Sequence, residues 1–218
     1  MLIASILKKY IELFIKYSEL QYLFLIFSAI IFLVTLFLAN IEGEVVTAVL
    51  YFLGMFFCGV YCSLVAALTE YFFLGRLPED VAKRNLLAGV VLGAAGMFLA
   101  LLQLTWQQLF FVFFLYYLLV VVVCYTVEPV GLRRAALVSL IYIIKYVKYS
   151  IITFIVYFLL GCLGAVLTSA SSPWMLAAGA LLAAAGCGLL AYLQALLYLS
   201  RYSSYKEIIF RELCSRKS

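Results

Sequence analysis

The sequence predicts an all-α protein that crosses a membrane several times, because three properties of the chain agree on that class. Apolar residues make up 68% of its 218 residues, and the mean hydropathy is +1.20. Apolar runs of about 18 residues or more recur along the chain, each long enough to cross a hydrocarbon core of about 30 Å as a helix. A single water-soluble core could not hide this much apolar surface. We therefore expect one integral membrane domain over residues 1–218.

Residues 1–19 are predicted to form an amphipathic helix that lies in the membrane interface. Leu7, Tyr10 and Phe14 repeat at helical spacing on one side, whereas lysines such as Lys8 and Lys16 lie on the other. A helix with this pattern lies along the membrane surface and does not cross it.

About six membrane-spanning helices are predicted after this first helix. Their ranges are about 21–39, 45–68, 86–102, 109–127, a fifth ending near residue 168, and 175–199. Between the fourth and fifth, residues 132–148 carry Arg134, Lys145 and Lys148 on one helical face, which indicates a second interfacial helix. A single tilted helix over residues 132–169, with its lysines reaching the interface, is the alternative.

The basic residues predict how these spans are oriented. All 15 Lys and Arg fall on one side once the spans alternate, and the positive-inside rule assigns that side to the cytoplasm. Both termini, the loop at residues 69–85 and the tail at residues 200–218 are therefore expected inside, with the protein in the cytoplasmic (plasma) membrane. Basic residues near membrane ends suit contact with the lipid bilayer, so nucleic acid is excluded as a partner.

Small residues at four-residue spacing predict which helices pack closely, because they let helix backbones approach in lipid. The second, third and sixth spans are therefore expected to be central, and the bulky first and fourth to face lipid. The cysteines are expected to be free thiols that serve as packing residues. The expected helix-packing residues are Gly54, Cys58, Cys62, Gly89, Gly93, Gly179, Ala183, Cys187 and Ala191.

Catalytic chemistry is not expected in this chain. No ionisable residue lies deep in a predicted span, which disfavours a proton-driven carrier. Motifs such as HExxH and CxxC are absent from the sequence, so we expect no enzyme activity, no cofactor and no metal site. Polar residues within spans, such as Ser63, Thr153 and Gln194, are expected to bond to neighbouring helix backbones.

The longest polar interruption between spans, TEYFFLGRLPEDVAKRN at residues 69–85, is the expected docking segment. Pro78 is followed by two acids and two bases, which predicts a short helix over residues 78–84. Charges that only keep the loop hydrated are the alternative interpretation. The candidate docking residues are Arg76, Leu77, Pro78, Glu79, Asp80, Lys83 and Arg84.

This layout resembles that of a small permease subunit of the ABC exporter class. The segment LGRLPEDVAKRNLLAG is similar to the family's coupling segment, and ALLYLSRYSSYKEIIFREL to its basic, Tyr-containing tails. The turn SASSPW is shorter than the family's usual segment there. The resemblance implies a transport subunit that moves an amphipathic or apolar substrate using a separate cytoplasmic ATPase, with other membrane subunits or a second copy as partners. The alternative is a non-transporting assembly or structural subunit of a larger membrane complex.

Overall fold

The predicted all-α class is confirmed by a computed structural model, which describes residues 2–38, 43–78, 80–102, 108–128, 130–168, 172–202 and 205–209. Within these ranges the chain forms helices and no strand. The first two helices are α1 (Leu2–Lys16) and α2 (Ser18–Leu38). Gln21 closes the junction between them, because its side-chain Nε2 donates to the backbone oxygens of Phe14 at 3.0 Å and Ile15 at 3.1 Å.

Among the residues that the structure describes, four helices are long and apolar enough to cross a membrane: α2, α3 (Glu44–Leu74), α4 (Val81–Leu102) and α8 (Pro173–Leu199). Helices α5 (Gln108–Val127) and α6 (Leu132–Lys145) are bent by 119° relative to each other and count as a fifth only if taken together. The described residues therefore support an integral membrane protein with four or five such helices, and the predicted count of six stays a prediction.

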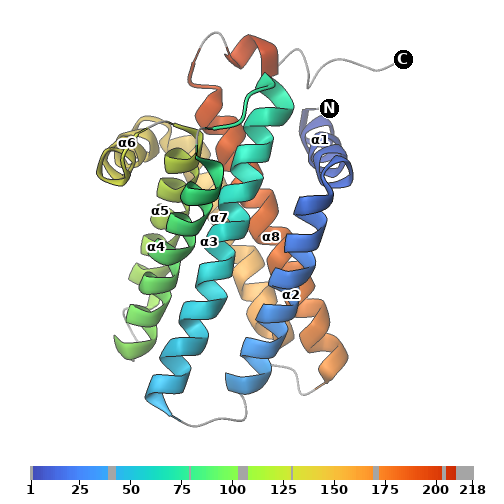
Figure 1. Cartoon of the computed structure of the whole chain (residues 1–218), viewed down its shortest axis with the longest axis vertical. Helices are drawn as coiled ribbons and strands as arrows, with labels where there is room; N and C mark the ends of the chain where they lie inside the picture. The colour runs from blue at the N-terminus through green and yellow to red at the C-terminus, as the bar shows by residue number, and fades with distance from the viewer. Residues whose placement is uncertain are drawn as a thin grey trace.

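The helices form an elongated bundle in which α3 and α8 are central (Figure 1). Helix α3 packs against α2, α4, α5 and α8, and α8 also packs against α7 (Val147–Thr168). By contrast, α4 packs chiefly on α3 and α5, so its predicted central position is wrong. Helices α1 and α6 lie across the bundle near the same end, where Figure 1 shows them nearly end-on. An interfacial helix would need this crosswise orientation.

The segment between α6 and α7 decides between the two alternatives for residues 132–169. Helix α6 ends at Lys145, and Tyr146 leaves helical geometry with φ −111° and ψ 38°. The Tyr146 N–H still donates to the Tyr142 oxygen at 2.9 Å, and the Ser150 N–H to the Tyr146 oxygen at 3.0 Å. Because the backbone of Tyr146 is not helical, α6 and α7 are two separate helices despite these two bonds. The alternative of a single long helix over residues 132–169 is therefore wrong.

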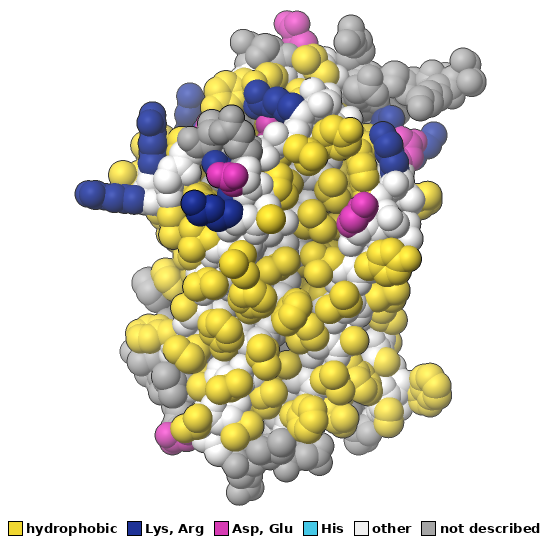
Figure 2. All heavy atoms as spheres, viewed as in Figure 1, with side chains coloured by type: hydrophobic (Ala, Val, Ile, Leu, Met, Phe, Trp, Pro, Cys, Tyr) yellow, Lys and Arg dark blue, Asp and Glu magenta, His cyan; other side chains and the backbone are white. Residues whose placement is uncertain are grey.

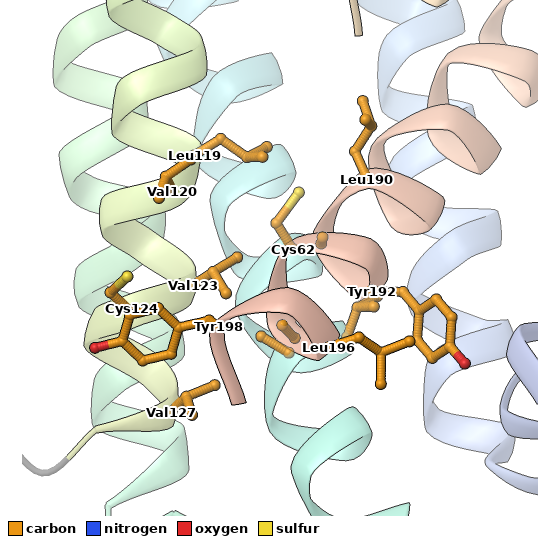
Figure 3. Packing of buried hydrophobic residues seen from close by; sticks show 14 of the residues in the cluster. Cys62, Leu119, Val120, Val123, Cys124, Val127, Leu190, Tyr192, Leu196 and Tyr198 are labelled. Atoms are coloured by element: carbon orange, nitrogen blue, oxygen red, sulfur yellow. The ribbon is translucent and has the colours of Figure 1, made fainter. Parts of the chain in front are cut away.

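Helix α5 shows that bulk alone does not place a helix against lipid. Every residue of the stretch 119–127 is buried, and its valines pack among α3, α4, α6 and α8. In Figure 3, Tyr198 of α8 points toward α5 beside Cys124, whereas Tyr192 points away from α5. The expectation that α5 faces lipid is therefore wrong for this half of the helix, because β-branched side chains also fill a protein core well. Helix α2, expected to face lipid, buries only three described residues, Leu20, Phe27 and Ser28.

The small-residue positions lie mostly inside the molecule. A Cβ added at Gly89 would come within 2.8 Å of Val60 on α3, and one at Gly93 within 2.9 Å of Phe52. Across the α3–α8 contact, the sulfurs of Cys58 and Cys187 are 3.9 Å apart. Of the other expected helix-packing residues, Cys62, Gly179 and Ala191 are buried and Ala183 is half-buried. Gly54 is half-buried as well, and a Cβ added there would meet only Val34 at 4.0 Å.

Free thiols are confirmed at the cysteines that the structure describes, which are Cys58, Cys62, Cys124 and Cys187. The side chains of Cys162 and Cys214 lie outside the described residues. No cluster of three or more Cys, Asp or Glu side chains suited to a metal occurs in the described part of the chain.

Candidate functional site

Positive charge gathers at one end of the molecule. On the face shown in Figure 2, the Lys and Arg side chains lie at the upper end, above a wide apolar surface. We call this the basic end. The α3–α4 loop, the turn between α5 and α6, and the segment after α8 all lie there (Figure 1).

The α3–α4 loop is much shorter than the predicted docking segment. Helix α3 continues to Leu74 and stops at Gly75, whose left-handed φ of 69° lets its N–H donate to the Tyr71 oxygen. Helix α4 begins at Val81, so the loop covers residues 75–80. The expected separate helix over residues 78–84 is wrong, since residues 81–84 form the first turn of α4.

The reason for the longer α3 is that its last two turns are part of the core. Thr69, Glu70 and Phe73 are buried, and the Glu70 side chain is only 2% exposed. A carboxylate at such a position needs a partner. Arg76 supplies it, with its Nε donating to Glu70 Oε1 at 2.6 Å.

Arg76 therefore holds the α3–α4 loop against the end of α3. Its guanidinium also stacks over the Tyr205 ring at 4.9 Å, which ties the loop to the segment after α8. Partial burial lowers the pKa of Arg76, but the bond to Glu70 more than offsets this, so its pKa lies above the ordinary value. Arg76 therefore stays charged at any physiological pH.

Arg84 forms a second tie at the basic end. Its guanidinium donates to the backbone oxygens of Tyr125 and Glu128, and it stacks over the Tyr125 ring at 5.0 Å. These oxygens belong to the C-terminal end of α5, where the helix dipole favours a cation. Arg84 thus links the start of α4 to the end of α5.

Glu128 forms a third tie, between the α5–α6 turn and the end of α8. Its carboxylate accepts from the Tyr202 hydroxyl and pairs with Arg201. The Arg201 guanidinium in turn lies 3.9 Å from the Tyr198 ring centroid. These three sets of contacts connect the α3–α4 loop, the turn between α5 and α6, and the segment after α8.

The predicted docking residues consequently divide into two groups. Arg76 and Arg84 have partners within the chain, so they hold the loop in place, although the Arg76 side chain is also 53% exposed. Leu77, Asp80 and Lys83 are exposed, with Leu77 53% exposed, and Pro78 is half-buried. Glu79 lies outside the described residues.

Polar side chains in the bundle bond to one another more than the sequence suggested. The Gln194 amide nitrogen donates to Tyr116 Oη and Thr153 Oγ1, both at 2.8 Å, joining α8 to α5 and α7. Ser63 Oγ similarly lies 2.6 Å from Asn85 Oδ1 and 2.7 Å from Thr126 Oγ1. The expectation that these residues mainly bond to helix backbone is therefore wrong for Gln194 and Ser63. Isolated polar residues in apolar runs are the sequence signal, but their partners lie in distant spans.

Sequence reasoning also missed a pocket at the basic end. It has a volume of about 290 Å³ and lies between α6 and the residues that follow α8. Its walls come from segments some 60 residues apart in the chain, so no local pattern could reveal it. The lining residues are Val138, Ile141, Tyr142, Lys145, Tyr146, Arg201 and Tyr202.

Comparisons with protein families, curated proteins and solved structures found no match to this chain.

Proposed function

We propose that this chain is the membrane-embedded subunit of a transport complex and docks a separate cytoplasmic ATPase through the α3–α4 loop. The observation that carries the proposal is an exposed loop with rigid internal support. Leu77 and Lys83 are open to a partner, while Arg76 and Arg84 anchor the same segment to the bundle. By the positive-inside rule, the basic end that carries this loop faces the cytoplasm.

The contacts of Arg76 and Arg84 would let a partner bound at the loop move the membrane-spanning helices. Force applied at the loop reaches α3 and α4 directly, α5 through Arg84, and the segment after α8 through the contact of Arg76 with Tyr205. Coupling over distance needs packed elements of this kind that move together. The substrate we propose is amphipathic or apolar, because the buried polar residues that the structure describes are uncharged apart from Lys9 and Glu70.

A non-transporting assembly or structural subunit is the second candidate, and the packing of the core favours it. Tyr61 of α3 and Tyr192 and Tyr198 of α8 are among the largest fully buried side chains, and all three belong to the hydrophobic core. Figure 3 shows Tyr192 and Tyr198 on opposite sides of α8. A path through a single chain would have to displace them. For transport, the substrate path would therefore lie between this chain and another membrane subunit or a second copy.

The experiment that tests docking changes only the exposed loop residues. The full-length chain is purified in mild detergent, and ATP hydrolysis by the co-purified complex is measured for Leu77→Asp and Lys83→Glu. We expect each change to lower the co-purified ATPase activity about tenfold, the effect of about 1.4 kcal/mol at an interface. Lys206→Glu is the matched control, because Lys206 is exposed near the same end but lies outside the loop, and it should leave the activity unchanged.

Two results would contradict the docking proposal. Either no ATP-hydrolysing subunit accompanies the wild-type chain, or both loop variants retain the full activity. A complex with another membrane protein that shows no ATP-dependent movement of lipid or peptide in vesicles would instead support the second candidate. Arg76 and Arg84 are unsuitable for this test, since changing either breaks contacts within the chain.

A further inference from the structure

The pocket between α6 and the end of α8 is positively charged. Lys145 and Arg201 line it, and Arg201 is balanced by Glu128. Lys145 lies 5.8 Å from the Tyr146 ring centroid, and no carboxylate of the described chain is within ion-pair distance of it. Between Glu128 and Glu207 the sequence contains no Asp or Glu at all. A ligand of this pocket should therefore carry negative charge.

The outer side of the same helix is apolar. Ile141 lines the pocket and is 63% exposed, and Leu137, Leu140 and Ile144 of α6 are also exposed. Helix α6 lies across the bundle at the basic end, where the charged surface meets the apolar one (Figures 1 and 2). A ligand that also has a long apolar part would cover this surface.

The volume of the pocket limits what can enter it. Its volume of about 290 Å³ is many times the roughly 10–15 Å³ that a single water molecule needs. This is room for a phosphate-bearing headgroup, but acyl chains would have to lie outside, along α6. A molecule with one anionic head and apolar chains fits both surfaces.

We propose that this pocket binds the headgroup of an anionic phospholipid, with Lys145 paired to its phosphate and an acyl chain lying on the exposed aliphatic residues of α6. Lysine near a membrane surface adds affinity for anionic lipid, and a hydrogen bond to a charged group is stronger than one between neutral groups. The lipid would join α6 to the end of α8 in addition to the Glu128–Arg201 pair. The proposal does not depend on transport or on the docking of an ATPase.

Native mass spectrometry of the full-length chain in detergent micelles tests this site, with phosphatidylglycerol or phosphatidylcholine added. We expect the wild type to retain phosphatidylglycerol in preference to phosphatidylcholine. Lys145→Gln should reduce phosphatidylglycerol retention by about tenfold, as expected when a charge-assisted hydrogen bond is lost. Lys148→Gln is the matched control: it removes the same charge from an exposed residue outside the pocket lining, and it should retain the wild-type preference.

A second variant separates the pocket from general surface charge. Ile141→Trp adds bulk at an exposed lining residue without changing charge, so it should fold normally and still lose phosphatidylglycerol. Circular dichroism checks that each variant keeps its helix content. Inorganic phosphate is added as a competitor and should not displace the lipid.

Each of the opposite results would overturn the proposal. Equal retention of the two lipids by the wild type would show that charge is not recognised. Unchanged retention in both Lys145→Gln and Ile141→Trp would place the lipid elsewhere. Displacement of phosphatidylglycerol by an equal concentration of inorganic phosphate would mean that the pocket recognises free phosphate and not a lipid.

Discussion

At the scale of single residues, the contact between α3 and α4 depends on one glycine more than on the others. A Cβ at Gly59 would lie 2.5 Å from the Ala88 oxygen and 2.8 Å from the Ala88 carbonyl carbon. Because these are backbone atoms of a facing helix, no side-chain rotation can relieve the overlap. We expect Gly59→Ala to lower the free energy of unfolding by about 1–3 kcal/mol, as overpacking does in cores.

The matched control is Gly54→Ala, five residues earlier on the same helix. An added Cβ there meets only Val34 Cγ1 at 4.0 Å, which is ordinary contact. Since Ala is the better helix former, this change should be neutral or slightly stabilising. Unfolding of the purified chain in a detergent titration measures both variants, and equal midpoints for the two would show that α3 and α4 are not packed this closely.

The same two glycines show how far the sequence predicts packing. Four-residue spacing identified a small-residue face that included Gly54 but not Gly59. Spacing defines a face of one helix, whereas the closest approach depends on where two helices cross. The crossing point is a property of the pair, so it could not be derived from either helix alone.

At the scale of helices, the end of α3 is set by Gly75. Its φ of 69° is in the left-handed region, where a side chain is strained, and an added Cβ would meet no atom within 4 Å. Gly75→Ala should therefore carry a purely conformational cost of about 1–2 kcal/mol. Hydrogen exchange in peptides covering residues 71–78 should rise in this variant, because the capping bond to Tyr71 is weakened.

Gly131 supplies the comparison for Gly75. It also has open space around it, but it precedes α6 with an ordinary φ of −69°. Gly131→Ala introduces no left-handed strain, so it should leave exchange in residues 71–78 unchanged, and any loss of stability should come from the weaker N-cap of α6. A similar loss of protection in both variants would mean that side-chain bulk, and not the left-handed conformation, matters at these positions.

The sequence located the helices better than it located their ends. Glu70 and Arg76 suggested a polar loop, because a lone carboxylate in an apolar run usually marks the end of a span. Its partner Arg76 follows six residues later, beyond the cap, and its half-exposed guanidinium neutralises the buried carboxylate from the surface. The candidate docking segment therefore lies where the sequence predicted it. Its two arginines, however, bond to Glu70, Tyr125 and Glu128 within the chain and so have a structural role.

At the scale of the whole molecule, the sequence predicted that the Lys and Arg residues lie at one end, but it did not predict the contacts that connect the segments there. Counting Lys and Arg along alternating spans already placed them at one end, and Figure 2 shows this end on the visible face. The pairing of Glu128 with Arg201, and the pocket beside Lys145, join segments that are far apart in sequence. Such contacts follow from the order in which helices pack, which composition and periodicity do not specify.

The two ends of the bundle should face opposite sides of the membrane. Lys83 is exposed at the basic end, whereas Trp174, which is 85% exposed, is in the first turn of α8 at the other end (Figure 1). A membrane-impermeant maleimide added to intact cells should label Trp174→Cys, and it should label Lys83→Cys only after the membrane is opened. The wild-type chain gives the background, since its described cysteines are buried or half-buried. The reverse pattern would place the basic end outside, against the positive-inside rule, and labelling of both from one side would show that the bundle does not span the bilayer.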